Sequence, residues 1–175
     1  MSDVETPDEE PEGVTVEPAP VLHGAPVTVI AGQNVLHATT ETYPELLANL
    51  QAEGFGQVVD LCGVDYLLGG RPAVPASIET ERFEVVVNLL SHVKRERIRV
   101  RAQVAEGDSI ASIFDLYPGT EAMEREAFDM YGIEFDGHPD LSRILMPENW
   151  QGHPLRKDFE VGRIPVQFKA APRQD

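Results

Sequence analysis

The chain has 175 residues and a formal net charge of −16 at pH 7, and this length fits one ordinary domain with some tail. Its acidity argues against general binding to nucleic acid or to anionic lipid, because both need clustered Lys and Arg. A single cysteine excludes a disulfide within the chain, and it excludes an iron–sulfur cluster held by this chain alone, because such a cluster takes four Cys or His ligands with at least two thiolates.

Residues 1–24 form an acidic segment rich in Pro and Glu. Seven Asp and Glu side chains, with no Lys or Arg, precede residue 21. Such a composition buries too little apolar surface to offset chain entropy, so we expect a disordered tail. The segment lacks the pattern of a presequence, and no apolar run approaches the roughly 20 residues of a spanning helix. A reducing cytoplasm is therefore the expected compartment.

Residues 25–136 are expected to form the folded domain. Val27–Ile30 suits a short first strand. Thr42 and Glu45 have the spacing of a capping box, and leucines follow at helical spacing until Gly54. This pattern predicts an amphipathic helix.

The middle of the chain favours strands. Gln57–Leu61 is typical of one, and Cys62 follows in an apolar run without nearby cations, which favours a buried, inert thiol. Arg82–Leu90 and Arg97–Val104 alternate apolar side chains with period two, and the linker between them is short. We expect these two segments to form an antiparallel hairpin.

A stripe of arginines is the strongest basic feature: Arg95, Arg97, Arg99 and Arg101. A sheet that binds RNA would need exposed aromatic side chains between the arginines, and this segment has none. We therefore favour a salt-bridged face toward acidic residues such as Glu81 and Glu84, or toward a partner protein.

Two helices are expected before the character of the chain changes. Ser109–Leu116 suits a short one, and a second runs from near Thr120 to Tyr131, with Gly132 as its C-terminal cap. The sequence thus predicts an α+β fold, with helices packed on a mixed, mainly antiparallel sheet.

Charged residues on the second helix have several interpretations. Arg125 lies four residues from both Glu121 and Asp129, a spacing that favours ion pairs, and its planar guanidinium suits a partly buried bidentate pair. Glu124, Glu126 and Asp129 could form a carboxylate pair for acid–base chemistry. Solvated or ion-paired carboxylates are commoner, so we do not favour catalysis.

Residues 137–175 are expected to form an extended C-terminal arm. Prolines recur too often for helices or central strands, yet large apolar residues are frequent. Long irregular segments in compact domains are usually functional or disordered, and this one is too apolar for disorder. The arm should therefore lie on a surface, either of its own domain or of a neighbour.

Histidines and carboxylates in the arm provide the ligand types of a zinc or iron site: His138, Asp140, Glu148, His153 and Asp158. Both histidines stand in Gly-His-Pro triplets, where turns allow a ring nitrogen to bond the backbone. The arm has no helical His pairing of the kind that metalloproteases use, so we favour structural or interface histidines.

The segment Glu124–Phe159 resembles the signature of the 30 kDa subunit family of respiratory complex I, known in bacteria as the C subunit of NADH-quinone oxidoreductase. The matching positions are Glu124–Ile133, Phe135, Gly137–Leu141, Arg143–Leu145, Pro147, Trp150 and Gly152–Phe159. A weaker resemblance reaches back to about Tyr43. The family usually has Arg where Ser142 stands, which puts that local contact in doubt.

This resemblance implies a partner-binding role. The arm would wrap the 49 kDa-type (D) subunit, near the iron–sulfur (B) subunit of the quinone site. The chain would hold no cofactor and no catalytic residue, with FMN and iron–sulfur clusters in partner subunits. It would reach the membrane only through those partners, at the cytoplasmic face of the bacterial plasma membrane, and would help to transfer electrons from NADH to quinone, coupled to proton translocation.

Nine residues are candidates for the partner interface: Arg125, His138, Asp140, Arg143, Trp150, His153, Arg156, Lys157 and Phe159. Two alternatives stay open. The chain could be the equivalent subunit of a related membrane-bound hydrogenase, or a free-standing metal-dependent enzyme that uses His138, Asp140 and His153.

Overall fold

The computed structural model describes residues 19–71 and 74–160, so the expectations for residues 1–18 and 161–175 lie outside the described residues. The elements in chain order are β1 Val21–Leu22, β2 Ala25–Ile30, β3 Gln33–Ala38, α1 Tyr43–Ala52, β4 Gln57–Asp65, β5 Phe83–Ser91, β6 Glu96–Val104, β7 Ser109–Ala111, the 3-10 turn η1 Pro118–Thr120, α2 Glu121–Tyr131 and β8 Glu134–Asp136.

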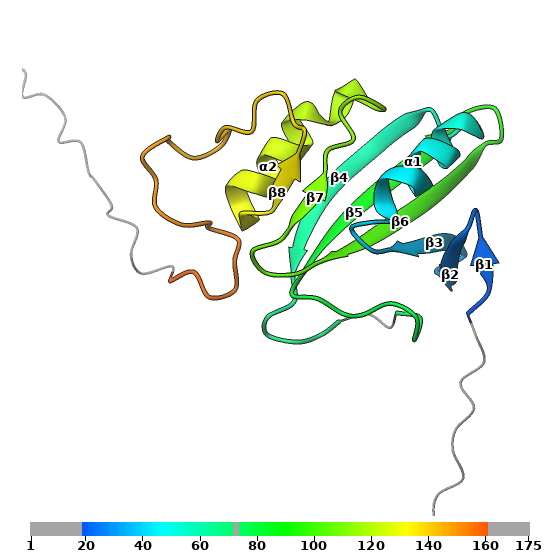
Figure 1. Cartoon of the computed structure of the whole chain (residues 1–175), viewed down its shortest axis with the longest axis horizontal. Helices are drawn as coiled ribbons and strands as arrows, with labels where there is room; N and C mark the ends of the chain where they lie inside the picture. The colour runs from blue at the N-terminus through cyan, green and yellow to red at the C-terminus, as the bar shows by residue number, and fades with distance from the viewer. Residues whose placement is uncertain (1–18, 72–73, 161–175) are drawn as a thin grey trace, which may run out of the picture.

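One six-stranded sheet, in the order β1-β2-β3-β6-β5-β4, forms the centre of the fold (Figure 1). Every neighbouring pair is antiparallel except β3 and β6, which run parallel, with Asn34 opposite Ile98. A second sheet pairs β7 and β8 in parallel. The predicted α+β fold with a mixed, mainly antiparallel sheet is confirmed, as is the β5–β6 hairpin.

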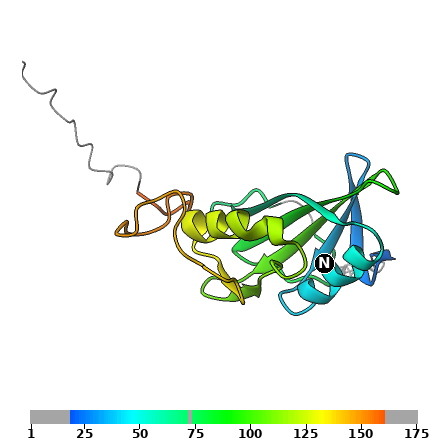
Figure 2. The same ribbon diagram turned by 90° about the horizontal axis from the view of Figure 1, so that it is seen from above.

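Both described helices pack on the same face of the six-stranded sheet (Figures 1 and 2). The alternation expected from the sequence places Phe83, Val85, Val87 and Leu89 of β5 in this core. Side chains between these core positions point to the opposite face, which we call the open face. The arginines of β6 lie there.

A glycine on β4 lets α2 approach the sheet closely. A Cβ atom at Gly63 would meet Tyr131 Cδ2 at 2.7 Å and Ile133 Cδ1 at 3.2 Å. Any larger residue at this position would push the helix away from the strand.

The start of α1 differs from the expected capping box. Thr42 is the N-cap, but its side chain caps no helix N–H; instead its Oγ1 accepts a hydrogen bond of 3.0 Å from the backbone N of Thr39. The capping-box prediction was wrong because the Thr39 turn takes the acceptor that the helix would have used. The ends of both helices are as predicted: Gly54, with φ 98°, follows the end of α1, and Gly132, with φ 72°, caps α2.

Residues 109–116 do not form the expected helix. Ser109–Ala111 is strand β7, and the following turn is held by the buried carboxylate of Glu124, which accepts hydrogen bonds from the Ser112 hydroxyl at 2.5 Å and from the Ile113 backbone N at 2.9 Å. Pairing with β8 and this carboxylate override the local preference for helix. Glu124 therefore serves the fold and is not accessible for catalysis.

The expectation of a buried Cys62 was wrong, because Cys62 is exposed. It lies on β4, an edge strand of the sheet, opposite Val86 on the open face. Its neighbours Leu61 and Gly63 point into the core instead, as strand alternation requires. Within residues 19–71 and 74–160, no helix is long and apolar enough to cross a bilayer.

Candidate functional site

The described part of the arm, residues 137–160, follows β8 and contains no helix or strand. In both views it lies at the end of the molecule where α2 ends, away from β1, β2 and β3 (Figures 1 and 2). Its polar contacts with α2 show how an irregular segment becomes ordered. Through these contacts, residues 137–160 pack on their own domain.

Asp129, in the last turn of α2, is the main anchor of the arm. Its side chain is fully buried, and Oδ1 accepts a hydrogen bond of 2.5 Å from Arg143 Nη1. Oδ2 accepts three more from the backbone N atoms of Ile144, Leu145 and Met146, at 3.1, 2.8 and 2.8 Å. Burial alone would raise the pKa of Asp129, but these donors hold the pKa below its ordinary value. The carboxylate therefore stays ionised and fixes residues 143–146 of the arm against the end of α2.

Arg125 is a second anchor, with partners other than those expected. Its Nε donates to the Ser142 carbonyl at 3.1 Å, and its Nη2 donates to the Ser142 hydroxyl at 2.8 Å and to the Arg143 carbonyl at 3.2 Å. The predicted pair with Glu121 is confirmed at 3.7 Å. The predicted pair with Asp129 and the bidentate carboxylate pair were wrong, because Arg143 takes Asp129 and backbone oxygens of the arm surround Arg125.

Both histidines of the Gly-His-Pro triplets bond the backbone of α2. His138 Nε2 donates to the Glu121 carbonyl at 3.1 Å, while its Nδ1 accepts from the Asp140 backbone N at 3.1 Å. His153 Nδ1 contacts the Asp129 carbonyl at 3.0 Å, and burial lowers the pKa of His153. Across residues 19–71 and 74–160, no three His, Cys, Asp or Glu side chains gather as a metal site would require. The histidines act as ties between arm and helix.

The far end of the described arm is tied to α2 and to the end of β4. Arg156 Nε donates to the Tyr131 carbonyl at 2.5 Å, and the Lys157 backbone N donates to Asp65 Oδ2 at 2.8 Å. Asp65 is itself buried and paired with Arg82 at 3.1 Å. The arm therefore returns to the sheet after crossing α2.

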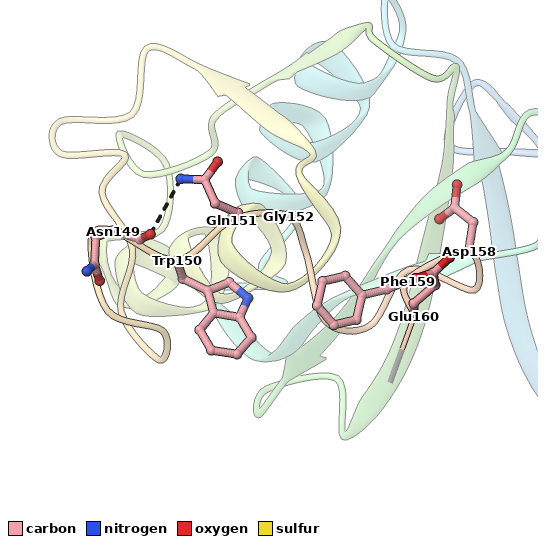
Figure 3. A pocket seen from close by; sticks show the side chains of 7 residues that line it. All are labelled: Asn149, Trp150, Gln151, Gly152, Asp158, Phe159 and Glu160. Carbon is pink, nitrogen blue, oxygen red and sulfur yellow. Dashed lines mark hydrogen bonds between the residues drawn. The ribbon is translucent and has the colours of Figure 1, made fainter. Parts of the chain in front are cut away.

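Trp150 and Phe159 form an aromatic pair that borders a cavity. Their ring centroids lie 6.5 Å apart with an interplanar angle of 28°. The cavity, of about 620 Å³, is shown in Figure 3 and is lined by Asn149, Trp150, Gln151, Gly152, Asp158, Phe159 and Glu160. The indole Nε1 of Trp150 is buried and finds no acceptor among the described residues. A donor of this kind is available to a partner's carbonyl.

Three large apolar side chains of the arm face outward. Ile144 is 41% exposed, Leu145 59% and Leu155 47%. Asp129 fixes the backbone of Ile144 and Leu145, and the Leu155 backbone N donates to the Met130 carbonyl at 3.0 Å, so all three side chains project from an ordered backbone. Such a surface is suited to binding a protein partner.

The nine sequence candidates thus fall into two groups. Seven of them form hydrogen bonds with the chain's own α2, β4 or neighbouring arm residues: Arg125, His138, Arg143, His153 and Arg156 through their side chains, and Asp140 and Lys157 through their backbone N atoms. Trp150 and Phe159 lie together at the cavity. Whether these residues also touch a partner stays a prediction.

Sequence reasoning missed Asp129 and Asp65 as anchors. One signal was present: a carboxylate in the last turn of a helix meets the negative end of the helix dipole, so Asp129 needs strong donors to be tolerated there. Asp65 gave no comparable local signal, because its arm partner, Lys157, is distant in the sequence.

Comparison with known proteins identifies relatives of this chain. Residues 36–164 match the family model described as "Respiratory-chain NADH dehydrogenase, 30 Kd subunit". The C subunit of NADH-quinone oxidoreductase from Phenylobacterium zucineum is 49% identical over 116 residues, which cover 66% of this chain and 51% of that protein. The chain thus spans about half the length of this relative.

Two further relatives extend the comparison. The C/D subunit of NADH-quinone oxidoreductase from Bdellovibrio bacteriovorus is 39% identical over 153 residues, or 83% of this chain and 26% of that protein. A solved structure, the trypsin-resistant fragment (1-134) of Nqo5, superposes with a TM-score of 0.59 at 34% identity, covering 67% of this chain and 90% of the fragment. The family match covers well over half of the chain, so this protein belongs to the family of the 30 kDa subunit of respiratory-chain NADH dehydrogenase.

Proposed function

We propose that the chain is a non-redox structural subunit of NADH:quinone oxidoreductase, complex I. It braces the subunits that form the quinone site, while FMN and iron–sulfur clusters in its partners transfer electrons from NADH to quinone, coupled to proton translocation. The chain has no active site of its own in this proposal. Its single cysteine supports a non-redox role, because a cluster needs at least two thiolates.

The observation that carries this proposal is the fixed apolar surface of the arm. Leu145 is 59% exposed although the backbone N atoms of Leu145 and its two neighbours are bonded to the buried Asp129. Ordering a backbone costs roughly 1–2 kcal/mol of conformational free energy per residue. Because this surface is already ordered in the free chain, binding a partner does not include that cost. A rigid, apolar, irregular surface therefore favours a permanent protein partner.

The proposed partners are the D subunit, of the 49 kDa type, and the B subunit with the iron–sulfur cluster of the quinone site. The relative named as a C/D subunit supports the D partner, because two proteins that occur fused in one organism are usually neighbours when separate. We place the assembly at the cytoplasmic face of the plasma membrane, where the chain is peripheral and reaches the bilayer only through its partners.

Co-purification tests this proposal. The full chain, affinity tagged in its native host, should bring down the other subunits of the oxidoreductase, identified by mass spectrometry. Leu145→Asp and Trp150→Ala should each weaken binding of the D subunit about thirtyfold and so reduce its recovery, since hot-spot residues are worth ~2 kcal/mol or more. Both should lower the melting temperature of the free chain little.

The matched control is Val93→Asp, in the turn between β5 and β6, because Val93 is 93% exposed and distant from the arm in the fold. It should leave recovery unchanged. The proposal fails if the chain brings down no other subunit, or if all three variants reduce recovery equally.

A further inference from the structure

A buried arginine on the open face keeps one donor unused. Arg101 donates to Glu84 through Nε at 2.7 Å and Nη2 at 2.6 Å, and its side chain is only 5% exposed. Gln103 and Tyr66 also donate to the Glu84 carboxylate, at 2.5 and 3.4 Å, so both its oxygens are engaged. Arg101 Nη1 is buried, with no acceptor in the described part of the chain. A buried donor that lacks an acceptor destabilises the fold.

This arginine lines a cavity of about 230 Å³, together with Ile30, Tyr66, Glu84, Val86 and Arg99. Arg99 adds a second guanidinium, half-buried and bonded through Nε to Asn88 at 2.8 Å. Two guanidinium groups against one carboxylate leave the cavity with a net positive charge. Guanidinium groups make strong charge-assisted hydrogen bonds with carboxylates, so the cavity suits a carboxylate from outside the described residues.

The chain carries a matching supply of carboxylates in residues 1–18, which contain seven acidic residues and no Lys or Arg. This segment joins the sheet just before β1. Val21 of β1 pairs with Pro26 of β2, and His37 of β3 pairs with Arg101 of β6. Because the β2–β3 register continues from Val27 opposite Leu36, these four residues form one row across the sheet.

The reach of the segment is sufficient. β1 and β6 are three strand positions apart, or about 14 Å at the usual spacing, whereas ten extended residues span about 33 Å. Tethering also raises the effective concentration of the carboxylates at the cavity to about the millimolar range. A separate acidic partner of equal affinity would need a higher concentration to displace them.

We propose that the acidic segment 1–18 docks on the open face, with one of its carboxylates in this cavity against Arg101 and Arg99. The occupant is thus a segment of the same chain. This inference is independent of the arm and of the proposed partners.

The one cysteine of the chain offers a direct test. Cys62 is exposed and lies opposite Val86, which in turn lies opposite Arg101, so a nitroxide on Cys62 sits near the cavity. In the full-length ¹⁵N-labelled chain at low salt, the nitroxide should broaden the amide resonances of residues 3–17. The broadening should disappear in 1 M salt, where the Debye length falls to about 3 Å.

Arg99→Gln should reduce the ratio of docked to free segment about tenfold, as should replacing Glu9, Glu10 and Glu12 with Gln. Arg97→Gln is the matched control, since Arg97 is exposed on the same face of the same strand but does not line this cavity. It should change the ratio less than twofold. Arg101 itself is left intact, because its removal would strand the buried Glu84 and endanger the fold.

Several results would overturn the inference. Absence of broadening, or equal loss in the Arg97 and Arg99 variants, would show that the segment does not use the cavity. A mixed sample would contain unlabelled chains that carry the nitroxide and ¹⁵N-labelled chains that do not. Broadening that requires this mixing of two chains would assign the cavity to a second copy. Absence of broadening in the free chain, with Arg99→Gln weakening recovery of other subunits, would assign it to an acidic partner segment.

Discussion

The carboxylate of Asp129 and the guanidinium of Arg143 meet at 2.5 Å where the arm crosses the last turn of α2. The side chain of Asp129 is fully buried, whereas that of Arg143 is 15% exposed. A negative charge at this end of a helix is unfavourable by itself. The donors of the arm offset the unfavourable charge of Asp129, so the helix and the arm stabilise one another.

Asp129→Asn should therefore loosen the arm. Loss of the charge weakens four hydrogen bonds at once, and we expect the free energy of unfolding to fall by about 2–3 kcal/mol. Hydrogen exchange of the Ile144, Leu145 and Met146 amides should accelerate more than exchange in β5. Glu126→Gln, at an exposed position of the same helix, is the control. Unchanged exchange in the arm would refute the anchoring role.

Gly132→Ala should displace the arm by a direct clash. A Cβ atom there would meet His153 Nε2 at 2.6 Å and Arg156 Nη2 at 2.7 Å, and Gly132 has φ 72°. Gly137→Ala separates the two effects, because Gly137 has φ 84° but nothing lies within 4 Å of the place where its Cβ atom would stand. We expect both variants to lose about 1 kcal/mol to backbone strain, and Gly132→Ala to lose a further ~1–3 kcal/mol to the clash. Equal melting temperatures would contradict this prediction.

Stability should depend on pH through His37. Burial and the nearby Arg101 lower the pKa of His37 from 6.5 to about 4. The unfolded chain therefore binds more protons than the folded chain between these values, so stability is complete above pH 6.5 and falls as the pH drops toward 4. The loss is about 3 kcal/mol, and His153, whose pKa is also lowered, adds to it.

Urea denaturation of the His37→Gln variant at several pH values measures this contribution. Glutamine can keep the bond to Thr28 that His37 makes at 2.8 Å, so the fold should survive while the slope between pH 6.5 and 4 becomes shallower. His92→Gln, at an exposed position, should leave the slope as it is. An unaltered slope in the His37 variant would exclude His37 as the cause.

The buried pair of Glu84 and Arg101 should contribute more to specificity than to stability. Glu84→Leu alone leaves the Arg101 charge buried and should cost about 3–5 kcal/mol. Combining it with Arg101→Met should recover most of that loss, because two apolar side chains of similar volume replace both charges. Chemical denaturation of both single variants and the double variant tests this. A double variant as unstable as the sum of the singles would show that the two residues are not coupled.

How much of this fold could be predicted from the sequence depended on whether the signal was local. The alternation of Phe83, Val85, Val87 and Leu89 fixed both β5 and its buried face, and Gly132 marked the end of α2. Strand β3 gave no such alternation, because it lies between β2 and β6 in the sheet and Val35, Leu36, His37 and Ala38 are all buried.

The candidate site was predictable in part. Its apolar and proline-rich composition indicated a surface-bound arm, but not which surface. The surface is set by Asp129, which binds residues 143–146. Strand β8 separates Asp129 from these residues in the sequence, and local patterns did not predict that strand. Ser142, where the comparison with the family signature put a contact in doubt, contacts Arg125 through its hydroxyl and carbonyl.

The parallel pairing of β3 with β6 has a consequence for the order of folding. The β5–β6 hairpin closes a short loop, whereas joining Asn34 to Ile98 closes a long one, and the entropy lost grows with loop length. We expect the amino-terminal strands to dock late, on a preassembled three-stranded nucleus. Pulse-labelling during refolding should then protect amides of β5 earlier than those of β2, and simultaneous protection would argue for a single concerted step.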